Sequence, residues 1–320
     1  MTLSELYLFK EKVLELCDSK SSLDSVNQLS ANLKILSKNV DTITADVINN
    51  EIGTINNITR YIESWDGLNT IIKHINSQIH ILSREFFADD YVKELCRKLR
   101  NSEHRLNLDL HIPDDVKDDL LSRIRTYVDW HYPTLELGCF KGTWTNFLVG
   151  GDPLYIVDLD DCFLSETNSK FNMFYQQRLR KYKIDLVTDG NNLSELPQNQ
   201  FGFIFSCDFI NRLAFKTVEY YLKNLFELLR PGGVLMFTYN NGETYCGADG
   251  AMRRIRGYVP QSMLVDVCSK IGYEIIHLYD YDRGYTSWAE IKKPGTLATI
   301  KQGQALGRIE DYKPFDFAKK

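Results

Sequence analysis

The chain of 320 residues lacks several features that would assign it to a special class. No stretch approaches the roughly 20 apolar residues that a membrane-spanning helix needs. The acidic and apolar start has no basic region of the kind that opens a secretory signal peptide. No two of the seven cysteines are spaced as CxxC, and their odd number argues against a disulfide framework. We therefore expect a cytoplasmic protein with reduced thiols, no metal site and no membrane partner.

A strong charge of one sign is also missing. The chain has 38 Lys and Arg against 43 Asp and Glu, so its net charge is −5. This balance differs from the basic composition of most nucleic-acid-binding proteins, although a local basic patch stays open. Apolar residues make up 43% and charged residues 25%, which is ordinary for a folded soluble chain and excludes wholesale disorder.

Proline is absent before about residue 90, and this region reads as helix. Apolar residues there alternate steps of four and three, which is the a/d seam of a coiled coil. The seam comprises Leu29, Leu33, Leu36, Val40, Ile43 and Val47, then Ile55, Ile58, Ile62, Trp65, Ile72, Ile75, Ile79, Leu82 and Phe86. We predict a helical, coiled-coil region over 1–88 that forms a homo-oligomer. An intrachain hairpin bent near Gly53, or pairing with another protein's helix, is the alternative.

Residues 89–131 are predicted to form a helical connector. Tyr91, Leu95 and Leu99 keep helical spacing. A second helix opens at Pro113-Asp114-Asp115, where carboxylates favour the positive end of the helix dipole. Its inward face comprises Val116, Leu120, Ile124 and Tyr127 or Val128.

From Pro133 onward, strands and helices alternate, which predicts an α/β domain over 132–294 with a parallel sheet covered on both faces. Helices are expected at Thr217–Leu229 and Gln261–Ile271, and a weak helix near Gln302–Ile309 in a tail over 295–320. Five parallel strands are expected at 134–137, 154–157, 183–187, 203–206 and 234–238. Two further strands, Tyr273–Tyr279 and Tyr285–Ile291, lie too close in sequence for a parallel crossover and must form an antiparallel pair.

The first strand leads into a glycine-bearing turn, Leu135–Thr145. Gly138 allows a tight turn, and Gly142 allows close contact between strand and helix. Such a turn directs backbone N–H groups and a helix N-terminus at a ligand carboxylate or phosphate. Two acids extend this site: Asp158 ends the second strand, where it can bind a ribose diol, and Asp189 follows the third. Because parallel strands end at one edge, these groups converge on one crevice.

These segments together resemble the class I S-adenosylmethionine-dependent methyltransferases. The matching segments are 135–142, 155–161, 187–213 and 224–241, and the resemblance covers about 115–293. It implies a Rossmann-like seven-stranded methyltransferase sheet with a reversed final strand. It also implies S-adenosyl-L-methionine as the cofactor and methyl transfer as the reaction.

The resemblance also assigns roles to residues. Glu136 is expected to orient the methionine amino end of the cofactor. Gly138, Phe140 and Gly142 would shape the loop, Asp158 would bind the ribose, and Asp189 with Gly190 would bind the adenine. Cys207 is expected beside the cofactor at the methyl-transfer site. Asp208 and Tyr239 are the candidate catalytic residues, and His277, inside a strand, is a weaker candidate.

The chain departs from the family at several positions. Phe140 replaces a middle glycine of the loop, as in some related methyltransferases. Arg212 stands where many small-molecule methyltransferases have histidine, so the resemblance supplies no general-base histidine. The chain reads Ser206-Cys207-Asp208-Phe209 after the fourth strand, which lacks the Asp/Asn-Pro-Pro-aromatic signature of nucleic-acid N-methyltransferases. A small-molecule or glycan-type acceptor is therefore favoured over nucleic acid.

The segment after the fifth strand is a second source of acceptor contacts. Residues 240–250 are polar and glycine-rich, which is typical of a lid or an acceptor-binding loop. The basic run Arg253–Arg256 follows, as an anion contact or as a solvated helix face. The alternative function is a structural or assembly protein with a methyltransferase-like fold, because a fold alone does not establish an activity.

Overall fold

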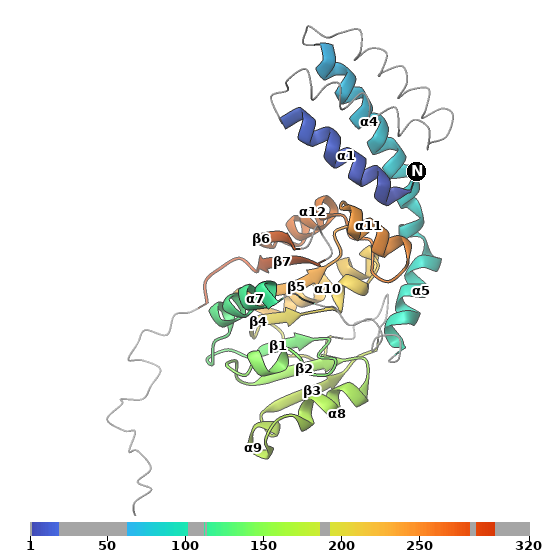
Figure 1. The fold of residues 1–320 in the computed structure, drawn as a ribbon. Helices are drawn as coiled ribbons and strands as arrows, with labels where there is room; N and C mark the ends of the chain where they lie inside the picture. Colours follow the sequence, from blue (N-terminus) through green and yellow to red (C-terminus); the bar gives the residue numbers. More distant parts are fainter. Residues whose placement is uncertain are drawn as a thin grey trace, which may run out of the picture.

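The computed structural model describes residues 2–18, 63–101, 112, 114–185, 193–281 and 286–297. Within these residues the centre is a seven-stranded sheet in the order β3-β2-β1-β4-β5-β7-β6 (Figure 1). Its strands are β1 (Thr134–Leu137), β2 (Leu154–Asp158), β3 (Leu179–Lys183), β4 (Phe201–Ser206), β5 (Leu229–Tyr239), β6 (Glu274–Tyr281) and β7 (Thr286–Lys292).

The first five strands are parallel and the last strand is reversed. β1 pairs with β2 on one side and β4 on the other, and β5 continues the sheet beside β4. β7 runs antiparallel to both β5 and β6 and lies between them. This confirms the antiparallel pair and the reversed final strand expected from the short link between the two last strands.

The largest differences from the predicted boundaries are at the third and fifth strands. The third strand lies at Leu179–Lys183 rather than 183–187. It is an edge strand that exposes Arg180 and Lys181 while Leu179 is buried, so its basic sequence concealed it. The fifth strand begins at Leu229, directly after helix α10 (Phe215–Leu228). Pro231-Gly232-Gly233 therefore lies inside the strand instead of ending the helix.

Helices cover both faces of the sheet, and each face has its own apolar cluster. On one face α10 and α12 (Gln261–Ile271) pack with the odd-numbered residues of β1, such as Leu135 and Leu137. On the other face α7 (Asp114–Tyr127) buries Val116, Leu120 and Ile124, as the sequence predicted. The remaining helices of this domain are η2 (Thr145–Phe147), α8 (Asp161–Ser169), α9 (Met173–Gln176), η3 (Ile210–Arg212) and α11 (Tyr245–Met252).

The N-terminal helices rest on the α/β domain. Helix α1 (Leu3–Asp18) packs against both α4 (Glu63–Ser83) and α11. The Tyr7 and Tyr258 hydroxyls are 2.6 Å apart in a buried hydrogen bond. The ring of Phe86, in η1 (Arg84–Phe87), stacks on Tyr258 with ring centroids 4.7 Å apart. Helix α5 (Asp89–Arg100) then continues along the domain and buries Tyr91, Leu95 and Leu99.

The predicted coiled-coil seam is only partly described. Its positions from Leu29 to Ile62, and the bend near Gly53, lie outside the described residues, as does the tail helix expected near Gln302–Ile309. Ile75, Ile79 and Phe86 are described, and the chain itself buries all three. The coiled coil and the oligomer stay predictions. Among the described residues, no helix has the length and apolar character needed to cross a membrane.

Candidate functional site

The carboxyl ends of β1, β2, β4 and β5 bring the predicted site residues to one edge of the sheet. The register pairs Leu137 of β1 with Val157 of β2, so the turn after β1 and Asp158 lie at the same level. The amide of Gly138 donates a hydrogen bond of 2.8 Å to the Val157 carbonyl, which fixes the start of the turn. This edge is where open parallel sheets bind ligands.

The turn after β1 requires both of its glycines. Gly138 (φ +78°) and Gly142 (φ +72°) are left-handed, a conformation that disfavours residues with a Cβ. A Cβ on Gly138 would lie 2.5 Å from Cβ of Phe209, and one on Gly142 would lie 2.9 Å from Cγ2 of Thr167. The close contacts predicted for this turn are therefore present, with α8 on one side and the chain after β4 on the other.

Phe140 takes the place of the middle glycine and is also left-handed, with φ +49°. Its amide donates to Oδ2 of Asp158 at 2.9 Å, and its carbonyl accepts from Thr167 Oγ1 at 3.0 Å. Its ring lies 4.6 Å from the ring of Phe163. These contacts offset a conformation that costs a non-glycine residue about 1–2 kcal/mol.

Asp158 holds this loop from below. Besides the Phe140 amide, its Oδ1 accepts from the amides of Leu159 at 2.7 Å and Asp160 at 3.2 Å. The residue has no exposed surface. A ribose diol therefore reaches this carboxylate only after the loop, or a group beside it, moves. Asp160 is the N-cap of α8, where it accepts from the Cys162 amide at 2.8 Å.

Glu136 is a buried acid with a single hydrogen bond among the described residues. It is 2% exposed, and Oε2 accepts from Thr145 Oγ1 at 2.5 Å. Burial, opposed by that bond and reinforced by the charge of Asp158, raises the pKa of Glu136 to about 8. The side chain is therefore largely protonated at neutral pH. A cation placed beside it would favour the ionised form.

The chain after β4 contributes Cys207 and Asp208. Burial, followed by the charge of Asp208, raises the pKa of the half-buried Cys207 thiol. Asp208 is left-handed with φ +56°, and its carboxylate forms an ion pair with Arg212 and accepts from Asn211 Nδ2 at 3.1 Å. The arginine that replaces the expected histidine thus binds the candidate base. Asp208 is therefore held by two side chains of the same short segment.

Tyr239 lies at the end of β5 and is 1% exposed. Its hydroxyl is 3.0 Å from Gln261 Oε1 and donates to it. Burial, with the charges of Asp280 and Glu243, raises the pKa of Tyr239. The phenol is therefore a neutral donor rather than a ready proton acceptor. His277 is exposed on β6, away from this edge.

The segment after β5 forms packed structure rather than the expected open loop. Asn240 Nδ2 donates to the carbonyls of Gly247 and Gly257, and Thr244 caps α11. Helix α11 lies beneath α1, with Ala248 and Ala251 buried. The glycines and polar residues of this segment suggested a lid. The sequence did not indicate that α1 covers the segment, because α1 is distant from it in the chain.

The basic run after α11 is engaged in ion pairs. Arg253 pairs with Asp249 at 2.9 Å, and Arg254 pairs with Glu94 of α5. Lys98 of α5 donates to the Arg254 carbonyl at 2.9 Å. These contacts support the reading of this run as a charged helix face and a contact for α5.

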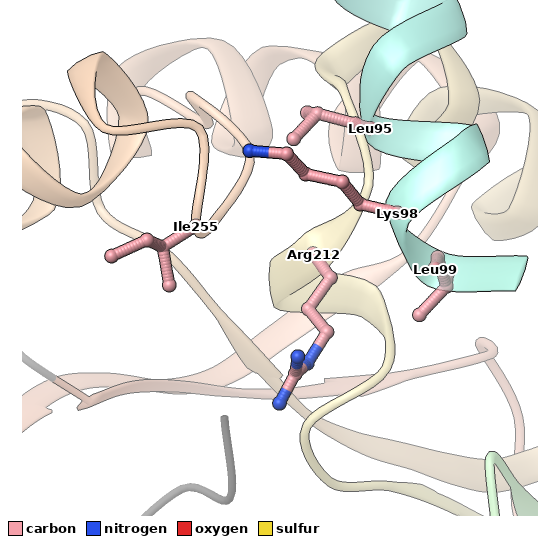
Figure 2. A pocket seen from close by; sticks show the side chains of 5 residues that line it. All are labelled: Leu95, Lys98, Leu99, Arg212 and Ile255. Carbon is pink, nitrogen blue, oxygen red and sulfur yellow. The ribbon is translucent and has the colours of Figure 1, made fainter. Parts of the chain in front are cut away.

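A small cavity separates α5 from the chain after β4. Figure 2 shows its lining residues, Leu95, Lys98, Leu99, Arg212 and Ile255. Its volume is about 10 Å³, which is room for one water molecule. The guanidinium of Arg212 points away from α5, and Lys98 reaches over toward Ile255 (Figure 2). The sequence did not reveal that α5 borders this edge, because its apolar spacing shows only that one face is buried.

Two expected adenine contacts, Asp189 and Gly190, lie outside the described residues and stay predictions. The remaining residues fit a bound cofactor in one respect: Glu136 is a buried acid that lacks the donors a buried carboxylate usually has. Within the ranges that the structure describes, no group of His, Cys, Asp or Glu side chains could hold a metal ion.

Residues 135–237 match the family described as "Methyltransferase domain". The chain contains a class I methyltransferase domain. The matched range runs from β1 to β5, and the strand order with its reversed β7 completes the sheet of that class. The family match confirms the resemblance seen in the sequence. S-adenosylmethionine is the methyl donor of this class.

Solved structures with related folds are distant in sequence. A S-adenosylmethionine-dependent methyltransferase from Mesorhizobium loti is 13% identical, with 55% of this chain and 96% of that chain covered and a TM-score of 0.45. The N-methyltransferase NodS from Bradyrhizobium japonicum, solved with S-adenosyl-L-homocysteine, is 15% identical, with 64% and 100% covered and a TM-score of 0.45. No curated protein matches the chain. At these values the fold assignment rests on the topology and the family match.

Proposed function

We propose that this methyltransferase domain transfers the methyl group of S-adenosylmethionine to a small-molecule or glycan-type acceptor. The observation that carries the proposal is the convergence of Glu136, the Gly138–Gly142 turn, Asp158 and Cys207 at the carboxyl edge of β1, β2 and β4. When bound, the cofactor supplies an activated methyl group. The chain's own residues bind it, orient it and exclude water.

Each residue has a role in this proposal. Glu136 would meet the ammonium end of the cofactor, and the Gly138–Gly142 turn would support its methionine part. Asp158 would take the ribose hydroxyls after the Phe140 amide gives way, and Asp189 with Gly190 would meet the adenine. Because methyl transfer depends mainly on alignment, positioning alone can supply about 7–11 kcal/mol of the barrier reduction.

The acceptor side is formed by Asp208, Arg212 and Tyr239. In this proposal Asp208, held by Arg212 and Asn211, orients the acceptor and takes a proton once one of these contacts is exchanged. Tyr239 donates its hydroxyl hydrogen bond to the acceptor only after it leaves Gln261, and its raised pKa keeps the phenol protonated.

The N-terminal region belongs to the same proposal. We infer that the seam over 1–88 joins copies of the chain into a cytoplasmic homo-oligomer, while α1 and α4 rest on the domain. Light scattering of the full chain should give a mass above that of one chain. The double variant Leu36→Asp/Ile43→Asp should then dissociate it. A monomeric wild type would overturn the oligomer.

Calorimetry with S-adenosylmethionine and S-adenosylhomocysteine tests the function. We expect micromolar binding, a ligand-dependent rise in melting temperature, and weaker binding by Asp158→Asn. The control Asp161→Asn removes an exposed carboxylate that pairs with Lys183 at 2.6 Å, and it should bind normally. If calorimetry shows no binding heat and the melting temperature does not change at millimolar ligand, the proposed enzymatic function is wrong.

A structural or assembly role is the second candidate, and one observation favours it. Asp158 has no exposed surface, and its two oxygens already accept three backbone amides. If Asp158 stays bound to these three amides, it is not available to a ribose, and the domain would have the methyltransferase fold without binding the cofactor. A folded chain that binds neither ligand would support this role.

A further inference from the structure

Large apolar side chains are exposed at the amino edge of the sheet, opposite the edge that holds the candidate site. Met173 is 66% exposed and Phe174 is 77% exposed, both in the short helix α9 that precedes β3. Val149, which precedes β2, is 41% exposed, and its carbonyl accepts from the Tyr175 hydroxyl at 3.3 Å. Two adjacent large apolar residues at such exposure are unusual for a surface that meets only water.

The short helix that carries them is firmly built. The Asn172 side chain accepts from the Tyr175 amide at 2.9 Å, and the rings of Phe171 and Tyr175 stack 5.1 Å apart. The guanidinium of Arg178 lies over the Tyr175 ring and pairs with Asp152. Phe171 and Tyr175 therefore anchor the underside, and Met173 and Phe174 are held outward.

Exposed cations follow this apolar tip in the sequence. Arg180 and Lys181 lie on β3, directly after α9. Lys170 is not among them, because its ammonium donates to the Lys141 carbonyl in the turn after β1. Asp152 pairs with Arg178, and Asp161 pairs with Lys183. We call Met173, Phe174, Arg180 and Lys181 the α9 patch. It combines a positive charge with two apolar side chains that can leave water.

A second copy of this chain fits the α9 patch poorly. β3 is the edge strand of the sheet, so pairing of two copies would bring Arg180, Lys181 and Lys183 of each chain together. Like charges on facing strands destabilise such pairing, and Lys and Arg on edge strands oppose it. An anionic surface that also accepts apolar side chains satisfies both parts of the patch.

We propose that the α9 patch docks this methyltransferase domain on an anionic lipid surface. Met173 and Phe174 enter the boundary between headgroups and acyl chains, and Arg180 and Lys181 lie among the phosphate and carboxylate groups. Figure 1 places α9 at the end of the molecule far from α1 and α4, so docking leaves the N-terminal helices away from the bilayer. The proposal does not depend on the methyl acceptor or on cofactor binding.

Vesicle sedimentation of the full chain tests this. We expect about tenfold stronger binding to vesicles of phosphatidylcholine with phosphatidylserine than to phosphatidylcholine alone, declining as salt is raised. The variants Met173→Ser/Phe174→Ser and Arg180→Glu/Lys181→Glu should each lose this binding.

Two controls remove an exposed side chain of the same kind elsewhere. Ile81→Ser changes a residue that is 52% exposed on α4, and Lys216→Glu changes a side chain that is 71% exposed at the start of α10. Both should bind vesicles as the wild type does, and circular dichroism should show all four variants folded.

Three results would overturn the proposal. The first is a wild type that binds neither vesicle, or both equally. The second is undiminished vesicle binding by the two α9-patch variants. The third is a wild type that ignores vesicles but binds an RNA oligonucleotide, or that self-associates through Phe174, since either outcome assigns the patch to another partner.

Discussion

Two buried glutamates on nearby strands of one sheet have different surroundings. Glu136 of β1 accepts one hydrogen bond, from Thr145. Glu290 of β7 has no exposed surface and accepts from Arg123 Nη1 at 3.2 Å, from the Tyr127 hydroxyl at 2.6 Å and from the Tyr279 hydroxyl at 2.9 Å. The donors to Glu290 come from α7 and β6, on either side of the strand.

The difference in hydrogen-bond donors distinguishes a structural acid, Glu290, from a candidate site acid, Glu136. Three donors, one of them a guanidinium, satisfy Glu290 and join α7 to the reversed part of the sheet. Glu136 lacks such partners, and burial raises its pKa to about 8. A buried acid that is left short of donors at a ligand-binding edge is a group prepared for a partner that the protein itself does not supply.

The largest expected effect is on Glu290. Glu290→Ala leaves Arg123 and two tyrosine hydroxyls without their acceptor and should lower the free energy of unfolding by about 3 kcal/mol. Urea denaturation measures this. The control Glu274→Ala removes a 57%-exposed side chain of β6 that pairs with Lys292, and it should cost under about 1 kcal/mol. Equal losses in both variants would remove the distinction.

Glu136→Gln should act on binding instead of folding. Loss of the carboxylate that we propose meets the cofactor ammonium should weaken S-adenosylhomocysteine binding by about 1.5–3 kcal/mol, measured by calorimetry. Glu166→Gln, exposed on α8, serves as the control and should bind as the wild type does. Unchanged affinity in Glu136→Gln would show that this acid is structural as well.

The pH dependence of stability should report Glu136 directly. Its pKa is raised from 4.5 to about 8 in the folded chain. The unfolded chain therefore releases this proton at lower pH, and the stability gained from the protonated form is lost as pH rises toward 8. Relative to Glu136→Gln, the wild type should lose on the order of 1–2 kcal/mol between pH 6 and pH 8. Parallel stability curves would contradict the raised pKa.

The smallest expected effect is at Phe140. Glycine adopts φ +49° without strain but loses the ring contact with Phe163, so Phe140→Gly should change stability by under about 1 kcal/mol. Cofactor affinity should change modestly, because the amide that meets Asp158 is kept. Thermal melting checks the fold, and an unfolded variant would show that Phe140 is a core residue.

The sequence predicted the sheet well because its strands carry local signals. β1 and α12 appear within their expected bounds, and the short link before β7 required an antiparallel pair. The predicted position of β3 was wrong because the sequence of an exposed edge strand resembles that of a basic loop. The spacing placed Glu136, the Gly138–Gly142 turn and Asp158 at the carboxyl ends of β1 and β2, since strand ends fix where they lie. Their role in cofactor binding stays a prediction.

The partners of those residues could not be found this way. The ion pair of Asp208 with Arg212 depends on a local left-handed turn, and the cover of α11 by α1 joins segments more than two hundred residues apart. Burial of Asp158 depends on how the Phe140 loop closes over it. Such contacts follow from three-dimensional packing, and the spacing of apolar residues in the sequence does not indicate them.

β7 follows every other strand in the sequence, yet it lies inside the sheet between β5 and β6. During synthesis β6 therefore leaves the ribosome before the strand that will attach it to β5. Until residues 286–292 have emerged, the open side of β5 has no partner strand, and Arg123 and Tyr127 lack their acceptor Glu290. A nascent chain stalled before β7 should expose this edge to chaperones, and its last step of folding is an insertion rather than an addition.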